Sequence, residues 1–539
     1  MDWTCDGVPK YNPEQYNGGS PHEPYVNNGS ICMMCGLPKE AVVLETGGGG
    51  GGGFDLKKIL IPIAGVLVVG GGGFGLYKAF SGKTTEPSVA TATAGVTSTT
   101  AGTPASPGDF LSSKAVSATL ISQGEKILLT GGKADAEKQA GAAAFVGKNR
   151  DEAIAKYQAA AKTDPNDPET KVYLNNATAQ KTGNPLTIAV VVPIGASADA
   201  AKEVLRGAAL YQDQYNKSPT VPGRLLEIVI VNDEVGKTQS IAQDLVNSPN
   251  VLGVLGHGID SSSQDAIKSY ETAGLAAISP VSSSVSIDAA NKATLKLTKV
   301  LEKTDEMLKV YLQKLGETIA NYANKNHSPA AIAIFYNSDS VYSKQLKELL
   351  VLEVPKASGK IVKEVDLKAG ATFDAKSAVA EVSKAGANVV FMAMSRDQVE
   401  QAIAIAQANK DTVPPLALMG GSELYNPTTL VKGADAIKDL VLAVPWRWEK
   451  DDPFSKQASE IWQGRVSWRT ATAFDATQAL TAAVSSNPTR EGTVKFLTAG
   501  TPISGTAKEF NLLKEIPLVK AVEGKDGPPG SKYQFDAIK

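Results

Sequence analysis

The chain contains few of the side chains on which most enzyme and metal sites depend. Its 539 residues include three histidines and three cysteines, and aromatic residues make up 6% of the total. The phosphate-binding loop G-x-x-x-x-G-K-[ST], the zinc-protease motif HExxH and the nucleophile motif GxSxG are absent from the sequence. We therefore expect a binding protein rather than an enzyme, with no cofactor in its main domain.

A dominant charge of one sign is also lacking. The 54 lysines and arginines nearly balance the 56 aspartates and glutamates, which leaves a net charge of -2. Nucleic-acid-binding proteins usually present a basic surface that attracts phosphates. The balance therefore argues against nucleic acid as a partner.

An uncharged stretch lies near the N-terminus. Residues 59–77, ILIPIAGVLVVGGGGFGLY, carry no charge, and their length is close to the ~20 residues that a helix needs to cross a bilayer. A cleaved signal peptide is the alternative, but a long segment precedes the stretch and no clear A-x-A cleavage site follows it. We predict a single transmembrane helix over 58–80 that anchors the protein in the inner (plasma) membrane.

Segments of flexible composition flank this stretch. Residues 47–57 begin with seven consecutive glycines, and 81–118 consist largely of Thr, Ser, Ala, Gly and Pro. Neither composition supplies enough apolar side chains to bury a core. Both segments are predicted to be linkers.

All three cysteines lie within residues 1–46. The motif CMMCG places Cys32 and Cys35 at a spacing that lets two thiolates bind one metal ion, and Cys5 and His22 are the remaining candidate ligands. A structural zinc site resembling a zinc ribbon is predicted, with thiols in a flexible, metal-free tail as the alternative. Because thiols persist in a reducing compartment, we expect the N-terminus in the cytosol and the chain after the span outside it.

Residues 119–183 have a helical pattern. Ala153, Tyr157, Ala160 and Pro165 resemble the second half of a tetratricopeptide repeat, in which small residues allow two helices to pack closely. A single repeat cannot bury both of its faces. We expect it to cap the domain that follows, with recruitment of a partner peptide as the alternative.

From residue 184 onward, apolar runs typical of buried parallel strands alternate with amphipathic helical stretches. The predicted strands are IAVVVPI, LEIVIVND, VLGVLG, LAAISPV, AIAIFYN, NVVFMAM, PLALMGG and DLVLAVPW. About 355 residues is too long for one core, so two α/β lobes with doubly wound parallel sheets are expected. A ligand would bind in the cleft between them.

These motifs, in this order, carry a family resemblance from Leu186 to about Asn511. They are VVPIG, VNDE, VLGVLGHG followed by SSSQDA, ISPVSSS, AIFYNSDSVYSKQL, MGGSELYNP and TATAFDATQAL. The chain resembles the type I periplasmic binding proteins, specifically the leucine/isoleucine/valine-binding group of ABC transporter receptors. The resemblance implies lobe 1 over 184–303 and 444–510, lobe 2 over 304–443 plus the C-terminal tail, and a hinge of three crossovers that closes over a ligand.

The resemblance also implies a pocket on the first lobe, with departures from the family. Where the family has a serine for the ligand α-carboxylate, this chain has Asp260, although Ser261 and Ser262 follow directly and a shift of one residue would restore the contact. The turn after ISPV matches the family better. There the Val281 carbonyl and the Ser283 hydroxyl and N–H, next to Ser282, would hold the amino and carboxylate groups.

On the second lobe, the resemblance makes Tyr342 the aromatic lid over the ligand. The acidic residue that pairs with the ligand ammonium corresponds to Ser422, with Glu423 beside it. Ser395, which follows the strand NVVFMAM, is a further candidate. The departures at Asp260 and Ser422 indicate either a local shift or a ligand other than an α-amino acid, such as a cationic or amide compound.

Two functional classes remain open. The first is an extracytoplasmic solute-binding protein that captures a small polar metabolite, expected to be an amino acid, and delivers it to an ABC permease and its ATPase. The second is a ligand sensor that signals to a cytosolic partner. The flexible linkers favour the first class, because they would not transmit rotation or piston motion. His257 and Trp446 are expected to have structural roles.

Overall fold

The computed structural model describes residues 118–257, 262–279, 294–296, 304–368, 373–499 and 516–538, together with short stretches among the first 42 residues. The chain divides into two compact units, Met1–Thr99 and Thr100–Lys539. The predicted linkers, apart from residue 118, and the predicted membrane helix over 58–80 lie outside the described residues.

The first unit contains a small hairpin and one turn of helix. Strand β1 (Trp3–Cys5) pairs antiparallel with β2 (Tyr25–Asn27), and α1 covers Lys39–Val42. Cys5 and Cys32 are buried, whereas the other predicted zinc ligands, His22 and Cys35, lie outside the described residues. Among the residues that the structure describes, no group of three potential metal ligands occurs. The zinc site therefore stays a prediction.

Apolar length was the basis of the predicted membrane anchor. Within the described ranges, no helix combines the length and hydropathy required to cross a bilayer. Because residues 58–80 are not among them, the anchor also stays a prediction.

The second unit begins with three packed helices, α2 (Asp135–Val146), α3 (Arg150–Thr163) and α4 (Pro168–Thr182). Ala153, Tyr157 and Ala160 of α3 are all buried. A Cβ atom on Gly141 of α2 would lie 2.6 Å from the Tyr157 ring, so only glycine fits there. The small and aromatic residues thus allow the close packing that the pattern predicted, while membership of a repeat family stays a prediction.

This helical segment is continuous with the first lobe. Strand β3 (Ile121–Ser122) pairs antiparallel with β5 (Leu226–Asn232) of the lobe. Asn176 of α4 also donates to the Ile228 carbonyl over 2.7 Å and accepts from the Ile228 N–H over 2.9 Å. Because these bonds satisfy buried groups of β5, the segment packs as part of the lobe.

The sheet of the first lobe has the strand order β3-β5-β4-β6-β7-β8. All its pairs are parallel except the one between β3 and β5. The further strands are β4 (Leu186–Val192), β6 (Val251–Leu255), β7 (Ala276–Ser279) and β8 (Thr294–Lys296). The helices are α5 (Ala198–Lys217), α6 (Thr238–Val246), α7 (Ser262–Thr272), α14 (Trp468–Ser486) and α15 (Arg490–Ala499).

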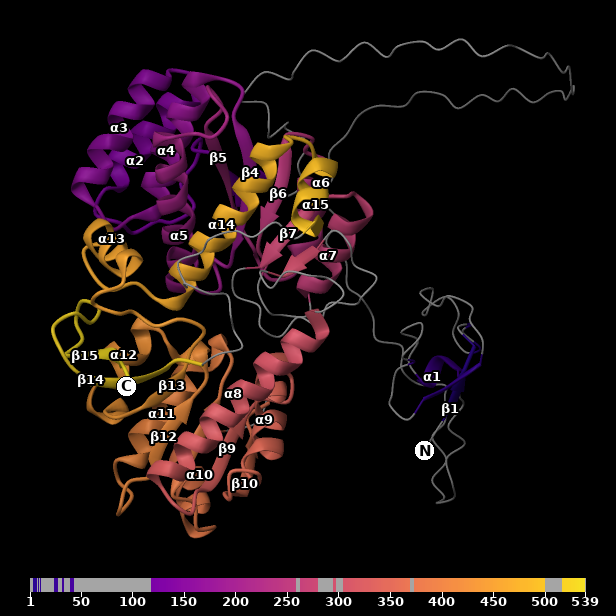
Figure 1. The fold of residues 1–539 in the computed structure, drawn as a ribbon, viewed down its shortest axis with the longest axis vertical. Coiled ribbons are helices and arrows are strands. Elements are labelled where there is room, and N and C mark those ends of the chain that lie inside the picture. The colour runs from indigo at the N-terminus through magenta and orange to yellow at the C-terminus, as the bar shows by residue number, and fades with distance from the viewer. Residues whose placement is uncertain are drawn as a thin grey trace, which may run out of the picture. The chain divides into compact units, whose positions relative to one another are not determined.

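Both faces of this sheet are buried, because successive side chains of a strand point to opposite sides. Ile188 and Val190 of β4 join the core cluster that includes α5 and α14, whereas Ala189 and Val191 join the cluster that includes α6 and α7. The continuous apolar runs in the sequence therefore reflect strands covered on both sides (Figure 1).

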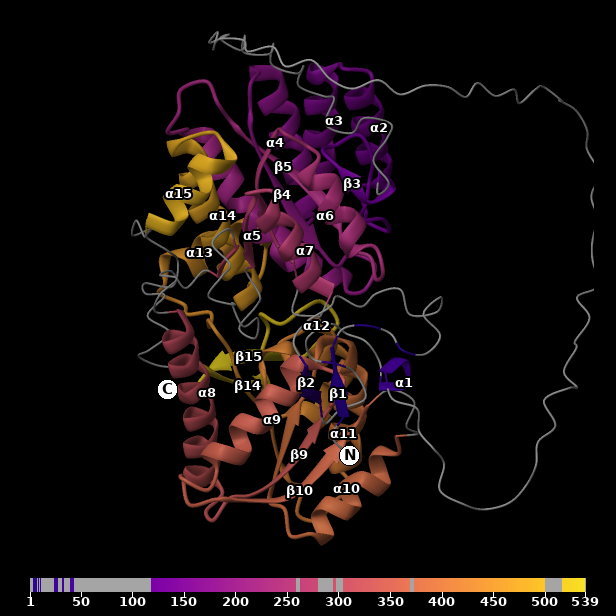
Figure 2. The ribbon, with the colours of Figure 1, turned by 90° about the vertical axis from the view of Figure 1, so that its right-hand side faces the viewer.

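The sheet of the second lobe has the order β10-β9-β11-β12-β13-β14-β15. Its strands are β9 (Ala331–Tyr336), β10 (Lys360–Asp366), β11 (Val389–Ala393), β12 (Ala417–Gly420), β13 (Val441–Ala443), β14 (Leu518–Glu523) and β15 (Tyr533–Ala537). The helices are α8 (Thr304–Asn326), α9 (Val341–Glu353), α10 (Ala375–Lys384), α11 (Val399–Asn409) and α12 (Pro427–Gly433). Helix α13 (Pro453–Trp462) follows β13 and packs on the first lobe, where the ring centroid of Phe454 lies 5.1 Å from that of Phe474 of α14. Figure 2 shows α8 and α9 alongside β9.

The prediction of two parallel sheets is wrong in part. Strands β14 and β15 are antiparallel to their neighbours in the second lobe, as β3 is in the first. Both sheets are therefore mixed. Strand β3 forms one edge of the first sheet, and the paired strands β14 and β15 form one end of the second. Antiparallel neighbours of this kind do not require a crossover helix.

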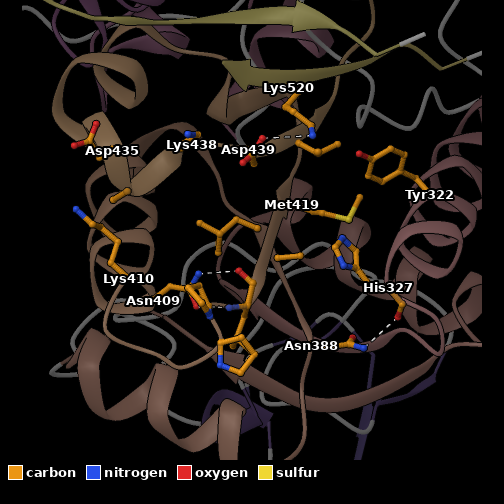
Figure 3. A pocket seen from close by; sticks show the side chains of 17 residues that line it. Tyr322, His327, Asn388, Asn409, Lys410, Met419, Asp435, Lys438, Asp439 and Lys520 are labelled. Carbon is orange, nitrogen blue, oxygen red and sulfur yellow. Dashed lines mark hydrogen bonds and ion pairs between the residues drawn. The ribbon is translucent and has the colours of Figure 1, made fainter. Parts of the chain in front are cut away.

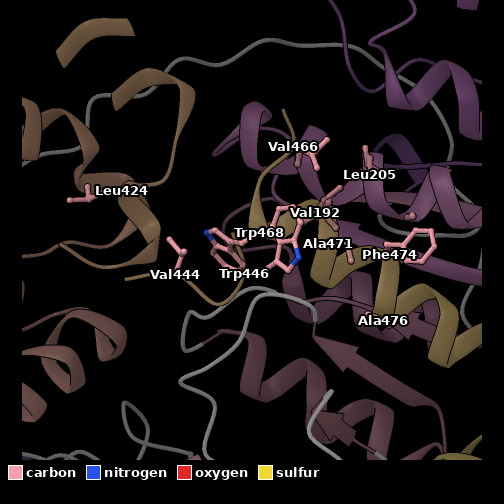
Figure 4. Close-up of a cluster of buried hydrophobic side chains, with 14 of the residues drawn as sticks. Val192, Leu205, Leu424, Val444, Trp446, Val466, Trp468, Ala471, Phe474 and Ala476 are labelled. Carbon is pink, nitrogen blue, oxygen red and sulfur yellow. The ribbon is translucent and has the colours of Figure 1, made fainter. Parts of the chain in front are cut away.

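The chain passes between the lobes three times, after β8, after β13 and after α15. Next to the second passage, a buried cluster contains Trp446 and Trp468 with Val192 and Leu205 of the first lobe (Figure 4). Trp446 packs edge-on against Phe454, with ring centroids 5.8 Å apart. The expected packing role of Trp446 is confirmed, and the apolar cluster fixes the segment that connects the lobes.

Candidate ligand-binding site

Each lobe has a switch point at the carboxyl edge of its sheet. In the first lobe, β5 and β6 lie on opposite sides of β4, and in the second lobe β10 and β11 lie on opposite sides of β9. Connections leave the sheet in opposite directions at such a point, which opens a crevice for a ligand. The predicted site residues on the two lobes follow strands that end at these edges.

The turns at the edge of the first lobe are tied together around His257. Its Nδ1 lies 2.9 Å from Asp233 Oδ2, and its Nε2 lies 2.7 Å from the Tyr270 hydroxyl. Its carbonyl accepts a bond of 2.8 Å from the Ser279 hydroxyl. Burial raises the pKa of Asp233, but the hydrogen bond and charge interaction with His257 outweigh burial and leave that pKa below its usual range. His257 is therefore a structural residue, as expected.

The other predicted site residues of the first lobe fall in or next to segments outside the described ranges. Asp260, Ser261, Val281, Ser282 and Ser283 lie outside the described residues. Ser262 begins α7, but its side chain is likewise not described. The carboxylate-binding half of the site stays a prediction.

On the second lobe, the structure brings Tyr342 and Ser422 together. Tyr342 lies in the first turn of α9, and its hydroxyl is 3.4 Å from Ser422 Oγ. A Cβ on Gly421 would lie 2.4 Å from this hydroxyl. The Tyr342 ring therefore fits at this position only because residue 421 is a glycine. Burial raises the pKa of Tyr342 to about 12. The phenol therefore stays protonated and can donate a hydrogen bond at neutral pH.

The neighbouring Ser343 fixes the position of this ring. The Asn337 N–H donates to Ser343 Oγ over 2.7 Å, and Ser343 Oγ donates to the Ala393 carbonyl. These bonds link the ends of β9 and β11 to the start of α9. Tyr342 is thereby held at the switch point.

Glu423 does not present a free carboxylate to the cleft. It is 2% exposed, and its Oε2 accepts a bond of 2.9 Å from Arg469 Nη2 and lies 3.5 Å from Arg396 Nε. Burial raises the pKa of Glu423, but the two guanidinium groups lower it by more, so that it lies below its usual range. The carboxylate is ionised and already paired within the protein.

Arg469 is the site residue that sequence reasoning missed. Besides Glu423, it contacts Glu203 Oε2 over 3.3 Å and the Tyr425 carbonyl over 3.0 Å. Burial lowers its pKa, but the two carboxylates raise it by more. The signal in the sequence was the arginine that directly precedes TATAFDATQAL.

This buried ion cluster spans the lobes. Glu203 and Arg469 belong to helices of the first lobe, whereas Glu423 lies in the short helix Ser422–Leu424 after β12 of the second. The Trp468 indole adds a bond of 3.2 Å to the Ser422 carbonyl. The residues beside the predicted ammonium site therefore also connect the lobes.

Ser395 and Arg396 follow β11 on the same edge. The Ser395 hydroxyl donates to Gln398 Oε1 over 2.9 Å within the short helix Arg396–Gln398, so Ser395 has a local structural partner. The Arg396 side chain is partly exposed beside Glu423. It also helps to lower the pKa of Asp233 on the other lobe. Arg396 thus places a positive charge that acts on a carboxylate of each lobe.

A separate pocket of about 800 Å³ lies at the opposite edge of the second lobe's sheet. Its lining includes Ala417 and Val441, where β12 and β13 begin, and the side chains of His327, Lys410 and Lys520 (Figure 3). Burial and the nearby Lys520 lower the pKa of His327. The pocket does not contain any of the predicted site residues.

The comparisons with known proteins agree with this architecture. A family model described as periplasmic binding protein matches residues 185–515. No curated protein matches the chain. Among solved structures, a leucine-binding protein from Thermotoga maritima aligns with TM-score 0.52 and 16% identity, covering 65% of this chain and 98% of its own.

Two further structures align over similar lengths. A branched-chain amino acid transporter substrate-binding protein from Streptococcus pneumoniae, in complex with isoleucine, gives TM-score 0.53 and 15% identity, covering 66% of this chain and 100% of its own. A solute-binding protein from R. palustris, in complex with 4-hydroxybenzoate, gives TM-score 0.54 and 12% identity, covering 66% and 96%. At these identities the likeness shows the fold alone.

Proposed function

The chain belongs to the periplasmic binding protein family, and on that premise we propose that it captures a small polar metabolite between its lobes. The observation that carries the proposal is the pair of switch points, with Tyr342 and Ser422 meeting at the edge of the second lobe. Such crevices bind ligands in open α/β sheets. The family is one of solute-binding proteins, and we assign no enzymatic step to this domain.

The ligand class follows from the charges beside the cleft. Arg469 and Arg396 engage the Glu423 carboxylate, so a ligand ammonium group would compete with two guanidinium groups for it. The Tyr342 and Ser422 hydroxyls and the Arg396 guanidinium suit a ligand carboxylate better. We propose an amino acid or a related small carboxylate, bound mainly through its carboxylate and its apolar body.

The transport role extends this proposal. Closure of two lobes over a ligand would create the surface that an ABC permease recognises, and the permease with its ATPase would take up the released ligand. The predicted membrane helix over 58–80 would keep the domain near the permease on the extracytoplasmic side. The linkers on each side would let the domain reach it.

Calorimetry on the full chain tests the binding step. Titration with leucine and isoleucine should identify a ligand, and Tyr342→Ala should weaken its binding by about tenfold or more. Lys217→Gln, an exposed change at the far end of α5, is the matched control and should bind normally. Equal affinity in Tyr342→Ala would show that the ligand does not occupy the proposed cleft.

A further inference from the structure

A second pocket, which we call the hinge pocket, has a volume of about 340 Å³. Its walls are α5 and the segment between α13 and α14 on one side, and the start of α12 and the β14–β15 hairpin on the other. It contains none of the predicted site residues of the cleft, although Glu203 of the buried ion cluster forms part of its wall. Such a volume lies near the lower end of the range for small-molecule sites, ~300–1,000 Å³.

Trp462 gives this pocket an unsatisfied donor. The side chain is 3% exposed, and its Nε1 is buried with no hydrogen-bond partner among the described residues. Two other tryptophans nearby are satisfied, since Trp448 donates to Ser459 Oγ over 2.9 Å and Trp468 to the Ser422 carbonyl over 3.2 Å. A buried N–H without an acceptor is costly, so an acceptor on a ligand would stabilise this wall.

Arg206 brings a positive charge to the wall of the hinge pocket. Its Nε is also buried without a partner, and its guanidinium carbon lies 5.9 Å from the centroid of the Trp462 ring. No hydrogen bond or ion pair joins Arg206 to another residue in the described part of the chain. Other arginines of the hinge are paired: Arg469 binds two glutamates and Arg465 binds Asp526 and Asp536.

The acidic residues of the same walls are engaged or exposed. Glu203 accepts from Arg469 over 3.3 Å, and Asp526 accepts from Arg465 over 3.0 Å. Asp199 lies exposed at the start of α5.

Burial lowers the pKa of Arg206 by more than the charges of Glu203, Asp199, Asp167 and Asp164 raise it. No hydrogen bond joins the guanidinium to any of these four carboxylates in the described part of the chain. It therefore keeps donors for an additional anion, which a carboxylate can satisfy with two oxygens.

The rest of the lining is mixed, because Lys202 adds a second positive charge, several side chains are polar amides, and one part is apolar. Pro427 and Leu430 of α12 and Pro528 and Phe535 of the β-hairpin region line the pocket. We propose that the hinge pocket is a second binding site, separate from the cleft, for a small organic carboxylate. The carboxylate accepts hydrogen bonds from Arg206 and Trp462 Nε1, and the apolar body packs against the proline-rich wall.

The position of the pocket gives its ligand an effect on the hinge. Residues of both lobes line it, so a bound molecule contacts both and its affinity differs between arrangements of the lobes. By linkage, occupancy of the hinge pocket then changes the affinity of the cleft for its own ligand.

Calorimetry on the full chain with benzoate as the probe tests the site. Benzoate should bind saturably, whereas benzamide, which has nearly the same shape but no charge, should bind about tenfold or more weakly. Arg206→Gln should weaken benzoate binding by a similar factor. Lys217→Gln, which removes one exposed positive charge from the same helix, should leave it unchanged.

Tyr342→Ala separates this site from the cleft and should leave hinge-pocket binding unchanged. Trp462→Phe, which removes the N–H while keeping an aromatic ring, provides a second variant if Arg206→Gln fails to fold, and it should weaken benzoate binding. The proposal is overturned if wild type does not bind benzoate up to ~10 mM, or if Tyr342→Ala removes all benzoate binding while the variants of Arg206 and Trp462 keep it. Failure to find a cleft ligand leaves this result unaffected.

Discussion

Arg469 Nη2 donates to Glu423 Oε2 over 2.9 Å, and this bond joins a helix of the first lobe to a strand-end turn of the second. Both side chains are almost fully buried. A paired charge of this kind contributes little net stability, but breaking the pair leaves an uncompensated buried charge. The contact therefore makes the structure next to the cleft sensitive to small changes.

The first prediction concerns that contact. Arg469→Met should destabilise the protein by about 3–5 kcal/mol, because Glu423 and Glu203 lose their buried partner. Urea denaturation measures the change. Lys432→Met is the control, since Lys432 is exposed and pairs with the exposed Glu400, and it should cost about 1 kcal/mol or less. A similar loss of unfolding free energy in both variants would show that the buried ion cluster is no more sensitive to the loss of a partner than an exposed ion pair.

The second prediction concerns pH and Glu227. Its carboxylate is buried and accepts from Gln180 over 2.6 Å and from Thr187 over 2.9 Å. Burial raises the pKa of Glu227 despite these bonds. Above the folded-state pKa the native protein holds a buried negative charge, so this group destabilises the fold at neutral pH. As pH falls toward the unfolded pKa of ~4.3, the native state binds the proton first and this destabilisation disappears.

Glu227→Gln, which never ionises, should therefore gain stability relative to wild type at pH 7. The gain should shrink as pH falls toward ~4.3. Thermal denaturation of both proteins across that range measures the difference. A difference that stays constant with pH would contradict the assigned titration.

The third prediction concerns helix packing in the first lobe. A Cβ on Gly207 of α5 would lie 2.2 Å from the Thr470 carbonyl of α14. Gly207→Ala should therefore push the helices apart and cost roughly 1–3 kcal/mol. Gly464→Ala is the control, because nothing lies within 4 Å of the added carbon. Equal denaturation midpoints for the two variants would refute the close approach.

The fourth prediction concerns the N-terminal tail. Purified full-length protein should contain about one zinc ion, and Cys35→Ser should lose it, because removal of one thiolate from a four-ligand site weakens binding strongly. Metal analysis by mass spectrometry after gel filtration provides the measurement. Zinc-free wild type that keeps a folded tail would exclude the site.

Several parts of the second lobe could not be predicted from local pattern. Strand β10 contains only exposed and half-buried residues and carries charges such as Lys363 and Glu364, because it lies at the sheet edge. The sequence of β10 therefore lacks the continuous apolar run from which the central strands were predicted. Strands β14 and β15 follow the last crossover, and their antiparallel pairing with the sheet is a non-local contact.

The candidate site also combines residues that could be predicted with contacts that could not. The family resemblance implied Tyr342 and Ser422 as site residues, and the structure places their hydroxyls 3.4 Å apart. Glu423 was also predicted as a site residue, but the side chains that bind its carboxylate were not predicted. Its partner Arg469 is 46 residues away, and the second carboxylate on that arginine, Glu203, is 266 residues away.

The sequence by itself determined the alternation of strands and helices, the two α/β lobes and the strand-end turns, because burial on both faces of a sheet imposes a periodic apolar pattern on neighbouring residues. Only the tertiary structure decided that the Glu423 carboxylate is paired within the protein and that the Arg206 guanidinium has no hydrogen-bonded partner among the described residues. Those outcomes depend on which side chains meet across the hinge, and local sequence carries no record of contacts between segments so far apart.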